Sequence, residues 1–121
     1  MDNEDFIAAV KLYVRDSAIQ GCLENFSDPP GRAPAADLVR LSKWYNALDD
    51  YGKEMVRQVV IDSVDSGLFG LFCVIDGVRR IDDKDPSGEF KLLYVNQSQE
   101  ILLNDFDEEF LHDLYNIETS A

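Results

Sequence analysis

The stretch KEMVRQVVIDSVDSGLFGLFCVIDG (residues 53–77) decides the fold. Its apolar residues recur at spacings of three and four, which predicts one long helical stripe that faces the core and ends at Gly77. Gly67 and Gly70 lie inside this stripe, and each lowers the helix propensity by about 1 kcal/mol. Either the helix breaks or kinks near Gly67, which we expect, or the glycines let another element approach closely.

The part of the chain before this stretch predicts two helices with a loop between them. In the first helix, Asp2 or Asn3 is placed to cap the exposed backbone donors, and Gly21 or Asn25 is placed to end it. The proline- and glycine-rich segment that follows cannot continue a helix. The predicted elements are a helix over 4–20, a loop over 25–34 and a helix over 35–48.

The part of the chain after the stretch predicts a β-hairpin and a last helix. Strand-forming residues flank the polar turn Asn96–Gln99, and Asn104 or Asp105 is expected to cap the final helix, with Phe106 on its core-facing side. The hairpin strands are predicted at 89–95 and 100–103. The sequence therefore predicts a mainly α-helical α+β fold, with three to four packed helices followed by a β-hairpin and a C-terminal helix, in a single globular domain over 1–121.

Negative charge is concentrated at one end of a chain whose formal net charge is −13. Residues 82–121 hold eleven acids against Lys84 and Lys91, a net charge of −9. A surface of this kind repels nucleic acid and membrane phosphates and attracts cationic proteins. The first residues have no secretory pattern, and no apolar run reaches the length of a membrane span. We therefore expect a cytoplasmic protein without a nucleic-acid or membrane partner.

The leading functional hypothesis is a protein-binding module whose acidic C-terminal surface docks a basic protein. An immunity or inhibitor role is its most concrete form, because acidic patches steer association with basic proteins. Tyr94 and Tyr115 are expected to be exposed anchors for the partner. The candidate partner-binding acids are Asp82, Asp83, Asp85, Asp105, Asp107, Glu108, Glu109 and Asp113. The oligomeric state, monomer or homodimer, stays open.

A second hypothesis is a calcium-binding domain that uses the 83–89 loop. Asp83, Asp85 and Ser87 stand at positions 1, 3 and 5 of a calcium-loop pattern. Position 12 falls on Tyr94, which cannot supply the bidentate carboxylate of that pattern. An ordinary polar turn uses the same residue types, so we expect a turn here and no cofactor.

A third hypothesis is a small enzyme of unknown reaction, although the expectation is that the chain is not an enzyme. His112 is the only histidine, and we expect it on the surface beside Glu108 and Glu109. Asp62 and Asp65 are one helical turn apart, as a paired acid and base would require. The spacing of Cys22 and Cys73 indicates reduced packing residues and no zinc site; none of these patterns identifies a catalytic residue.

Three phrases of the C-terminal half carry a resemblance: LFGLFCVIDGV (68–78), GEFKLLYV (88–95) and LNDFDEEFLHDLYN (103–116). Over residues 68–117 the chain resembles a family of small uncharacterised bacterial proteins. The resemblance implies a bacterial cytoplasmic origin and brings no functional residue with it. In size and acidity the chain is also similar to immunity proteins that neutralise basic nuclease toxins.

Overall fold

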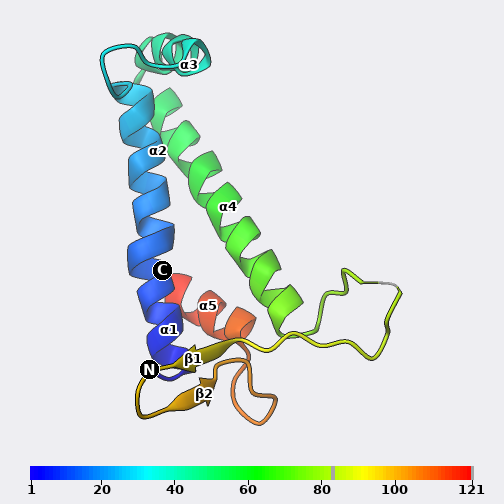
Figure 1. Cartoon of the computed structure of the whole chain (residues 1–121). Helices are drawn as coiled ribbons and strands as arrows, with labels where there is room; N and C mark the ends of the chain where they lie inside the picture. Colours follow the sequence, from blue (N-terminus) through cyan, green and yellow to red (C-terminus); the bar gives the residue numbers. More distant parts are fainter. Residues whose placement is uncertain (83, 121) are drawn as a thin grey trace. The chain divides into compact units, whose positions relative to one another are not determined.

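The computed structural model describes residues 1–82 and 84–120. Five α-helices, a π-helical segment and a two-stranded hairpin follow one another along this part of the chain (Figure 1). They are α1 (Asn3–Val10), the π-helical η1 (Lys11–Asp16), α2 (Ser17–Ser27), α3 (Ala36–Asn46), α4 (Asp50–Ile75), β1 (Leu93–Val95), β2 (Glu100–Leu102) and α5 (Leu111–Thr119). The predicted α+β, mainly α fold class is confirmed.

The contacts between residues divide the chain into two compact units. Unit 1 comprises Met1–Val14 and Ser66–Ala121, and unit 2 comprises Arg15–Asp65. Each unit has its own buried side chains, and each is described by itself below. The single domain that the sequence predicts therefore stays a prediction.

The core of unit 1 forms where α1, α5 and the C-terminal part of α4 supply large apolar side chains. Ile7, Phe72 and Tyr115 are each at most 3% exposed, and Leu111 and Leu114 complete the cluster. Edge-to-face and tilted ring contacts order this packing, with Phe72 and Tyr115 centroids 5.5 Å apart. Asp2 caps α1 through a capping box, as the sequence predicts.

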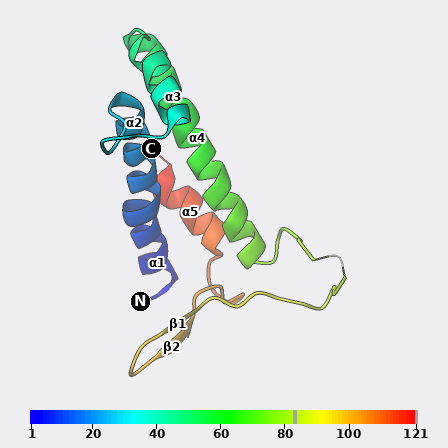
Figure 2. The same ribbon diagram turned by 45° about the horizontal axis from the view of Figure 1, so that its top comes forward.

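Helix α4 runs without interruption from Asp50 to Ile75, so the predicted break near Gly67 is wrong (Figure 2). The alternative interpretation, that a glycine lets another part of the chain approach the helix closely, agrees with the structure at Gly70. A Cβ atom on Gly70 would lie 2.6 Å from Nη1 of Arg79, so the glycine makes room for a guanidinium group. Among the described residues, α4 is the one helix whose length and apolar composition would suffice to cross a membrane, which differs from the sequence expectation that no apolar run reaches this length. The core helix of a water-soluble protein passes the same test of length and composition, and 17% of the apolar window of α4 is buried.

The end of α4 follows the sequence prediction. Gly77 adopts a φ of 80°, a left-handed conformation that glycine reaches without strain, and the chain then turns away. The amides of Val78 and Arg79 both donate to the carbonyl of Cys73, at 3.0 and 3.1 Å. These bonds satisfy a carbonyl that the helix end would otherwise leave open.

Helix α5 begins at Leu111, later than predicted, so the expected cap at Asn104 or Asp105 is wrong. The cap comes instead from the end of α4. Asp76 Oδ2 accepts the backbone N–H of His112 at 2.8 Å and lies 2.7 Å from Nδ1 of the same residue. An acidic side chain at a helix N-terminus is favoured by the helix dipole.

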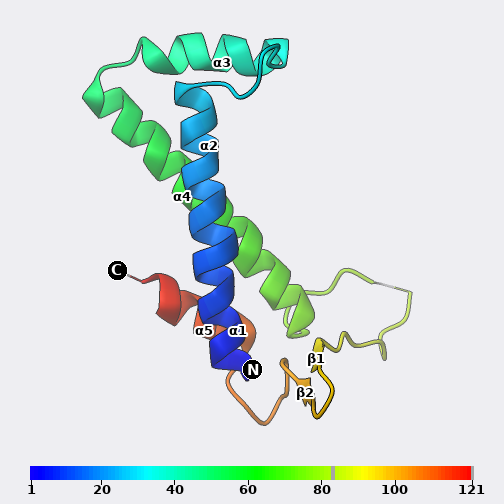
Figure 3. The ribbon, with the colours of Figure 1, turned by 60° about the vertical axis from the view of Figure 1, so that its left-hand side comes forward.

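Asn104 is buried and holds the hairpin to the end of α4. Its amide donates to the carbonyls of Ile75 and Phe90 at 2.9 and 2.8 Å, and its Oδ1 accepts the N–H of Leu92 at 2.8 Å. Strands β1 and β2 are neighbours in the chain's hairpin (Figure 3). They pair antiparallel, with Leu93 opposite Leu102. The predicted hairpin is confirmed. Its first strand is shorter than predicted, because the Asn104 side chain, and not a neighbouring strand, bonds the backbone of Phe90 and Leu92.

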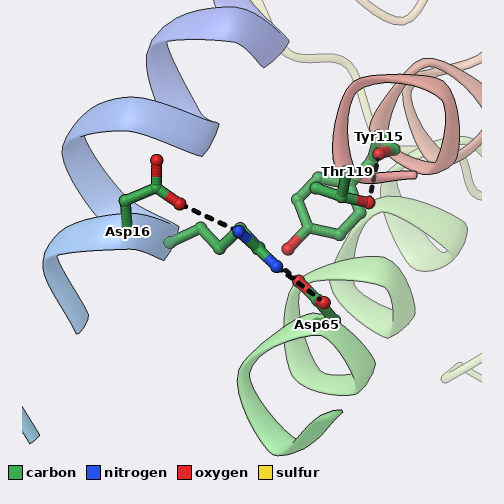
Figure 4. A network of polar contacts seen from close by, with 5 residues as sticks. Asp16, Asp65, Tyr115 and Thr119 are labelled. Carbon is green, nitrogen blue, oxygen red and sulfur yellow. Dashed lines mark hydrogen bonds and ion pairs between the residues drawn. The ribbon is translucent and has the colours of Figure 1, made fainter. Parts of the chain in front are cut away.

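Unit 2 is held by aromatic and ionic contacts among α2, α3 and the first part of α4. The rings of Phe26 and Tyr45 are 5.8 Å apart, and Lys53 Nζ lies 5.6 Å from the Tyr45 ring centre. Arg15 bonds Asp65 at 2.7 Å, with Asp16 on its other side (Figure 4). The hydrogen bond to Asp65 is the main reason why the pKa of Arg15 is raised.

Helix α2 extends to Ser27, beyond both predicted end points. A side-chain bond from Gln20 to Glu24 at 2.9 Å spans Gly21, which has open space around it. The Pro29–Pro30 pair then ends the helix, as the composition of the predicted loop requires. Helix α3 agrees with its prediction to within two residues at each end.

The role of Asn104 predicts a measurable loss of stability. Asn104→Ala leaves the carbonyls of Ile75 and Phe90 and the amide of Leu92 without the side chain that bonds them, and we expect it to lower the free energy of unfolding by about 2 kcal/mol. Chemical denaturation followed by circular dichroism measures the change. Asn116→Ala, an exposed position on α5, is the matched control and should change stability by less than about 0.5 kcal/mol. Equal effects of the two substitutions would contradict the role of Asn104.

Candidate functional site

The candidate site is a groove in unit 1, which we name the α4–β1 groove. It has a volume of about 300 Å³ and lies between the end of α4, the loop that follows it, and the turn after β2. Its lining residues are Val74, Gly77, Arg79, Arg80, Ile81, Asp82, Asp85, Gly88, Glu89, Phe90 and Phe106. The groove therefore combines apolar side chains with charges of both signs.

Three large apolar side chains of the groove are exposed to solvent. The exposed fraction is 64% for Ile81, 51% for Phe90 and 64% for Phe106. A cluster of exposed aromatic and aliphatic side chains with a charged rim is typical of protein-binding surfaces. The sequence prediction that Phe106 faces the core of a final helix is wrong, because the chain at this point forms a turn.

Asp82, Asp85 and Glu89 form the acidic rim of the groove, and Arg79 and Arg80 lie on the same lining. All five residues are exposed. The structure thus brings two of the predicted partner-binding acids, Asp82 and Asp85, to one site. Asp83, the third predicted acid of this segment, lies outside the described residues.

The Asp85 carboxylate organises a local turn. Its Oδ1 accepts the hydroxyl of Ser87 at 2.7 Å and the backbone N–H of Ser87 at 3.1 Å, and its carbonyl accepts the N–H of Gly88 at 3.2 Å. The hydrogen bond from the Ser87 hydroxyl is the main reason why the pKa of Asp85 is lowered. This is the polar turn that the sequence favours over a calcium loop.

The calcium hypothesis gains no support from the geometry of this loop. Ser87 directs its hydroxyl hydrogen to Asp85, so the two predicted ligands bond each other. Within residues 1–82 and 84–120, no group of three or more His, Cys, Asp or Glu side chains is arranged to hold a metal ion. The chemistry of the loop is therefore that of a hydrogen-bonded turn.

The other predicted acids lie outside the groove lining. Asp105 Oδ1 accepts the N–H of Asp107 at 3.0 Å, and the Asp105 carbonyl accepts the N–H of Glu108 at 3.1 Å. The Glu109 carbonyl accepts the Asn3 side-chain amide at 3.0 Å, which ties this segment to the start of α1. The side chains of Asp107, Glu108 and Glu109 are exposed and add to the negative field around unit 1.

The expected anchor Tyr115 is buried, so its prediction as an exposed contact is wrong. It is 1% exposed and packs in the core of unit 1 against Phe72, on an α5 helix that begins five or six residues later than the sequence suggests. The Thr119 hydroxyl donates to the Tyr115 carbonyl at 2.7 Å (Figure 4). Tyr94, the other expected anchor, is half-buried on β1.

His112 lies against the core, so its predicted surface setting beside Glu108 and Glu109 is wrong. Its side chain is 14% exposed, stacks on Phe110 and contacts the edge of Phe69. The carboxylate that holds it is Asp76, while Asp113 Oδ1 lies 3.4 Å from Nε2. This arrangement fixes the start of α5.

The remaining residues considered for catalysis do not form a constellation. Asp62 is exposed, whereas Asp65 bonds Arg15. Cys73 is buried, and burial is the main reason why the pKa of its thiol is raised, which disfavours the nucleophilic thiolate. Cys22 and Cys73 are both free cysteines.

A second groove, in unit 2, has a volume of about 910 Å³ and lies along α2 and the facing part of α4. Several of its polar side chains bond each other or their neighbours: Arg15 bonds Asp16, Gln20 bonds Glu24, and Arg57 bonds Glu54. The α4–β1 groove, with exposed aromatic side chains, is the stronger candidate.

The comparisons with known proteins add no relative. No protein-family model matches this chain, and neither the curated proteins nor the solved structures contain a match. The functional argument therefore depends on the geometry of the site alone.

The Asp85 turn predicts a pH response. Ser87→Ala removes the largest cause of the lowered pKa, so we expect the pKa of Asp85 to rise toward its ordinary value. In the native protein the turn stays intact at neutral pH and loosens as the pH falls through the lowered pKa, because protonation removes the charged acceptor. NMR titration of the Asp85 carboxyl carbon measures the shift.

Ser98→Ala is the matched control, since Ser98 forms the same kind of turn with Asn96, which does not titrate. An unchanged Asp85 titration in Ser87→Ala would show that the hydroxyl bond does not persist in solution.

Proposed function

We propose that this chain is an acidic protein-binding module whose α4–β1 groove docks a basic segment of a partner protein. The observation that carries the proposal is the joint lining of one groove by exposed Ile81, Phe90 and Phe106 and by the acidic rim of Asp82, Asp85 and Glu89. The aromatic side chains supply apolar contact area, and the acids supply orientation.

The negative charge of the chain supports a cationic partner. The formal net charge is −13, and the groove lies in the part of the chain with the largest excess of acids. Such a field increases the association rate with a basic protein and decreases it with an acidic one. The effect weakens as salt rises, because the groups on the rim are exposed to solvent.

Arg79 and Arg80 would make the groove selective for partners whose positive charges lie beside its acids and away from these two arginines. Gly70 makes room for the Arg79 guanidinium, and Arg80 lies next to it on the lining. A cationic side chain of the partner fits beside Asp82, Asp85 or Glu89 and is repelled from Arg79 and Arg80. Repulsive positions of this kind discriminate among partners.

An immunity or inhibitor protein that neutralises a basic partner is the most concrete form of this proposal. Its support is the acidity and small size of the chain together with the exposed groove. Cys73 is buried, and the Asp76–His112 pair joins two helix ends against the core, so binding is the function that the geometry supports best.

The proposal predicts that neutralising the rim weakens binding of a cationic probe. The probe is a short peptide in which pairs of lysines alternate with pairs of valines, so that each face of the extended peptide carries both residue types. Its affinity is measured by calorimetry at low and high salt. The triple variant Asp82→Asn, Asp85→Asn and Glu89→Gln should bind it about tenfold more weakly, because each rim charge contributes up to about 1 kcal/mol. Higher salt should weaken binding to the native protein.

The matched control is Asp28→Asn, Asp62→Asn and Glu118→Gln, which changes the net charge equally at exposed positions outside the groove lining. It should retain the affinity of the native protein to within about twofold. Equal weakening by both triple variants, or no binding of the peptide to the native protein, would overturn the proposal.

A further inference from the structure

The outer edge of β1 presents unpaired backbone groups. The amide of Leu103 donates to the carbonyl of Leu92 at 2.8 Å, and the amide of Asn96 donates to the carbonyl of Gln99 at 3.0 Å. Hydrogen-bonded pairs alternate in an antiparallel ladder, so the N–H and C=O groups of Leu93 and Val95 point away from β2. Among the described residues, none forms a hydrogen bond with these outward groups.

The inner edge of the same segment is fully used. Next to the strand, the Asn104 side chain bonds the Phe90 carbonyl and the Leu92 amide, as a neighbouring strand would. Asn104 is 6% exposed, so its amide is fixed in place. Residues 90–95 are therefore held extended from one side, with the other side free to receive a strand.

The side chains along the open edge are apolar and exposed. Leu93 is 45% exposed and Val95 is 63% exposed. Natural proteins usually protect such an edge with proline, a bulge or several charges. Residues 89–95 contain no proline, and Lys91 is the one lysine among them.

We propose that the partner adds an extended strand to the outer edge of β1, with its far end in the α4–β1 groove. This inference rests on the proposed function and names the mode of recognition. Phe90 and Glu89 line the groove and lead directly into β1, so a straight segment can contact both. Main-chain hydrogen bonds would give affinity, and alternate side chains would give specificity.

The charge around the edge determines the chemistry of the added strand. Glu89 precedes β1 and its carboxylate lies 3.6 Å from Lys91 Nζ, and Glu100 lies opposite Val95 on β2; all three charged residues are exposed. Directly opposed residues share one face of a sheet, so the Glu100 side chain lies on the same face as Leu93 and Val95. An added strand that carries both apolar and basic side chains on this face would place the apolar ones on Leu93 and Val95 and a basic one near Glu100. A second copy of this chain is disfavoured, because each copy has a net charge of −13. Residues 89–95 correspond to a contact length of about 20 Å, or about six residues of the partner.

The direct test is amide hydrogen exchange by NMR with the lysine–valine peptide as the probe. In the free protein we expect the amides of Leu93 and Val95 to exchange fast and that of Leu92 to be protected. With saturating peptide, Leu93 and Val95 should become protected at least tenfold. Protection confined to the groove residues, with unchanged exchange at Leu93 and Val95, would overturn strand addition while leaving the proposed function intact.

A pair of variants tests the same bond by a different route. Val95→Pro removes an outward N–H without touching the β1–β2 ladder, and Val95→Thr keeps the N–H at an exposed position. We expect the proline variant to bind the peptide at least tenfold more weakly than the threonine variant. Circular dichroism and thermal melting check that both fold. Equal affinities of the two folded variants would overturn the inference.

The test also distinguishes the other outcomes. If the native protein fails to bind the peptide at all, the proposed function and the inference both fail. If the outer amides of β1 are already protected in the free protein and sedimentation shows a dimer, a second copy occupies the edge and the inference fails.

Discussion

The structure of unit 1 depends on a buried carboxylate that joins two helix ends. Asp76, at the end of α4, accepts the backbone N–H of His112 and thereby caps α5. Burial of an acid is costly, and Asp76 Oδ1 has no hydrogen-bond partner in the described structure. The cost is offset by the helix dipole of α5 and by the two contacts of Oδ2 with His112.

This cap defines where the proposed functional surface forms. Gly77 begins and Phe110 ends the segment between the two helices, which holds the α4–β1 groove and the hairpin. Asn104 bonds this segment back to the Ile75 carbonyl, one residue before Asp76. The proposed binding surface is therefore a loop and hairpin closed at its base by polar contacts, with exposed apolar side chains.

The sequence predicts the parts of the fold that depend on local patterns. Apolar periodicity, Gly77 and the polar turn at Asn96–Gln99 are sufficient to predict that these helices and the hairpin exist, but not where α2 ends or that α4 is continuous. The start of α5 could not be predicted, since its capping carboxylate lies far away in the chain at Asp76. The sequence predicts one property of the groove, its acidity, from the excess of acids in this part of the chain. It does not predict that Phe90 and Phe106 are exposed, because both have the pattern of core residues.

The most direct test of this account is amide hydrogen exchange in Asp76→Ala, with Asp62→Ala as the control on the exposed part of α4. The account predicts that the amides of His112 and Leu92 lose protection together, by about tenfold or more, because loss of a cap of this kind costs about 1–2 kcal/mol. The amides of α3, in unit 2, should be unchanged. Unchanged exchange at His112 and Leu92 in a folded Asp76→Ala protein would contradict the central role of the buried carboxylate.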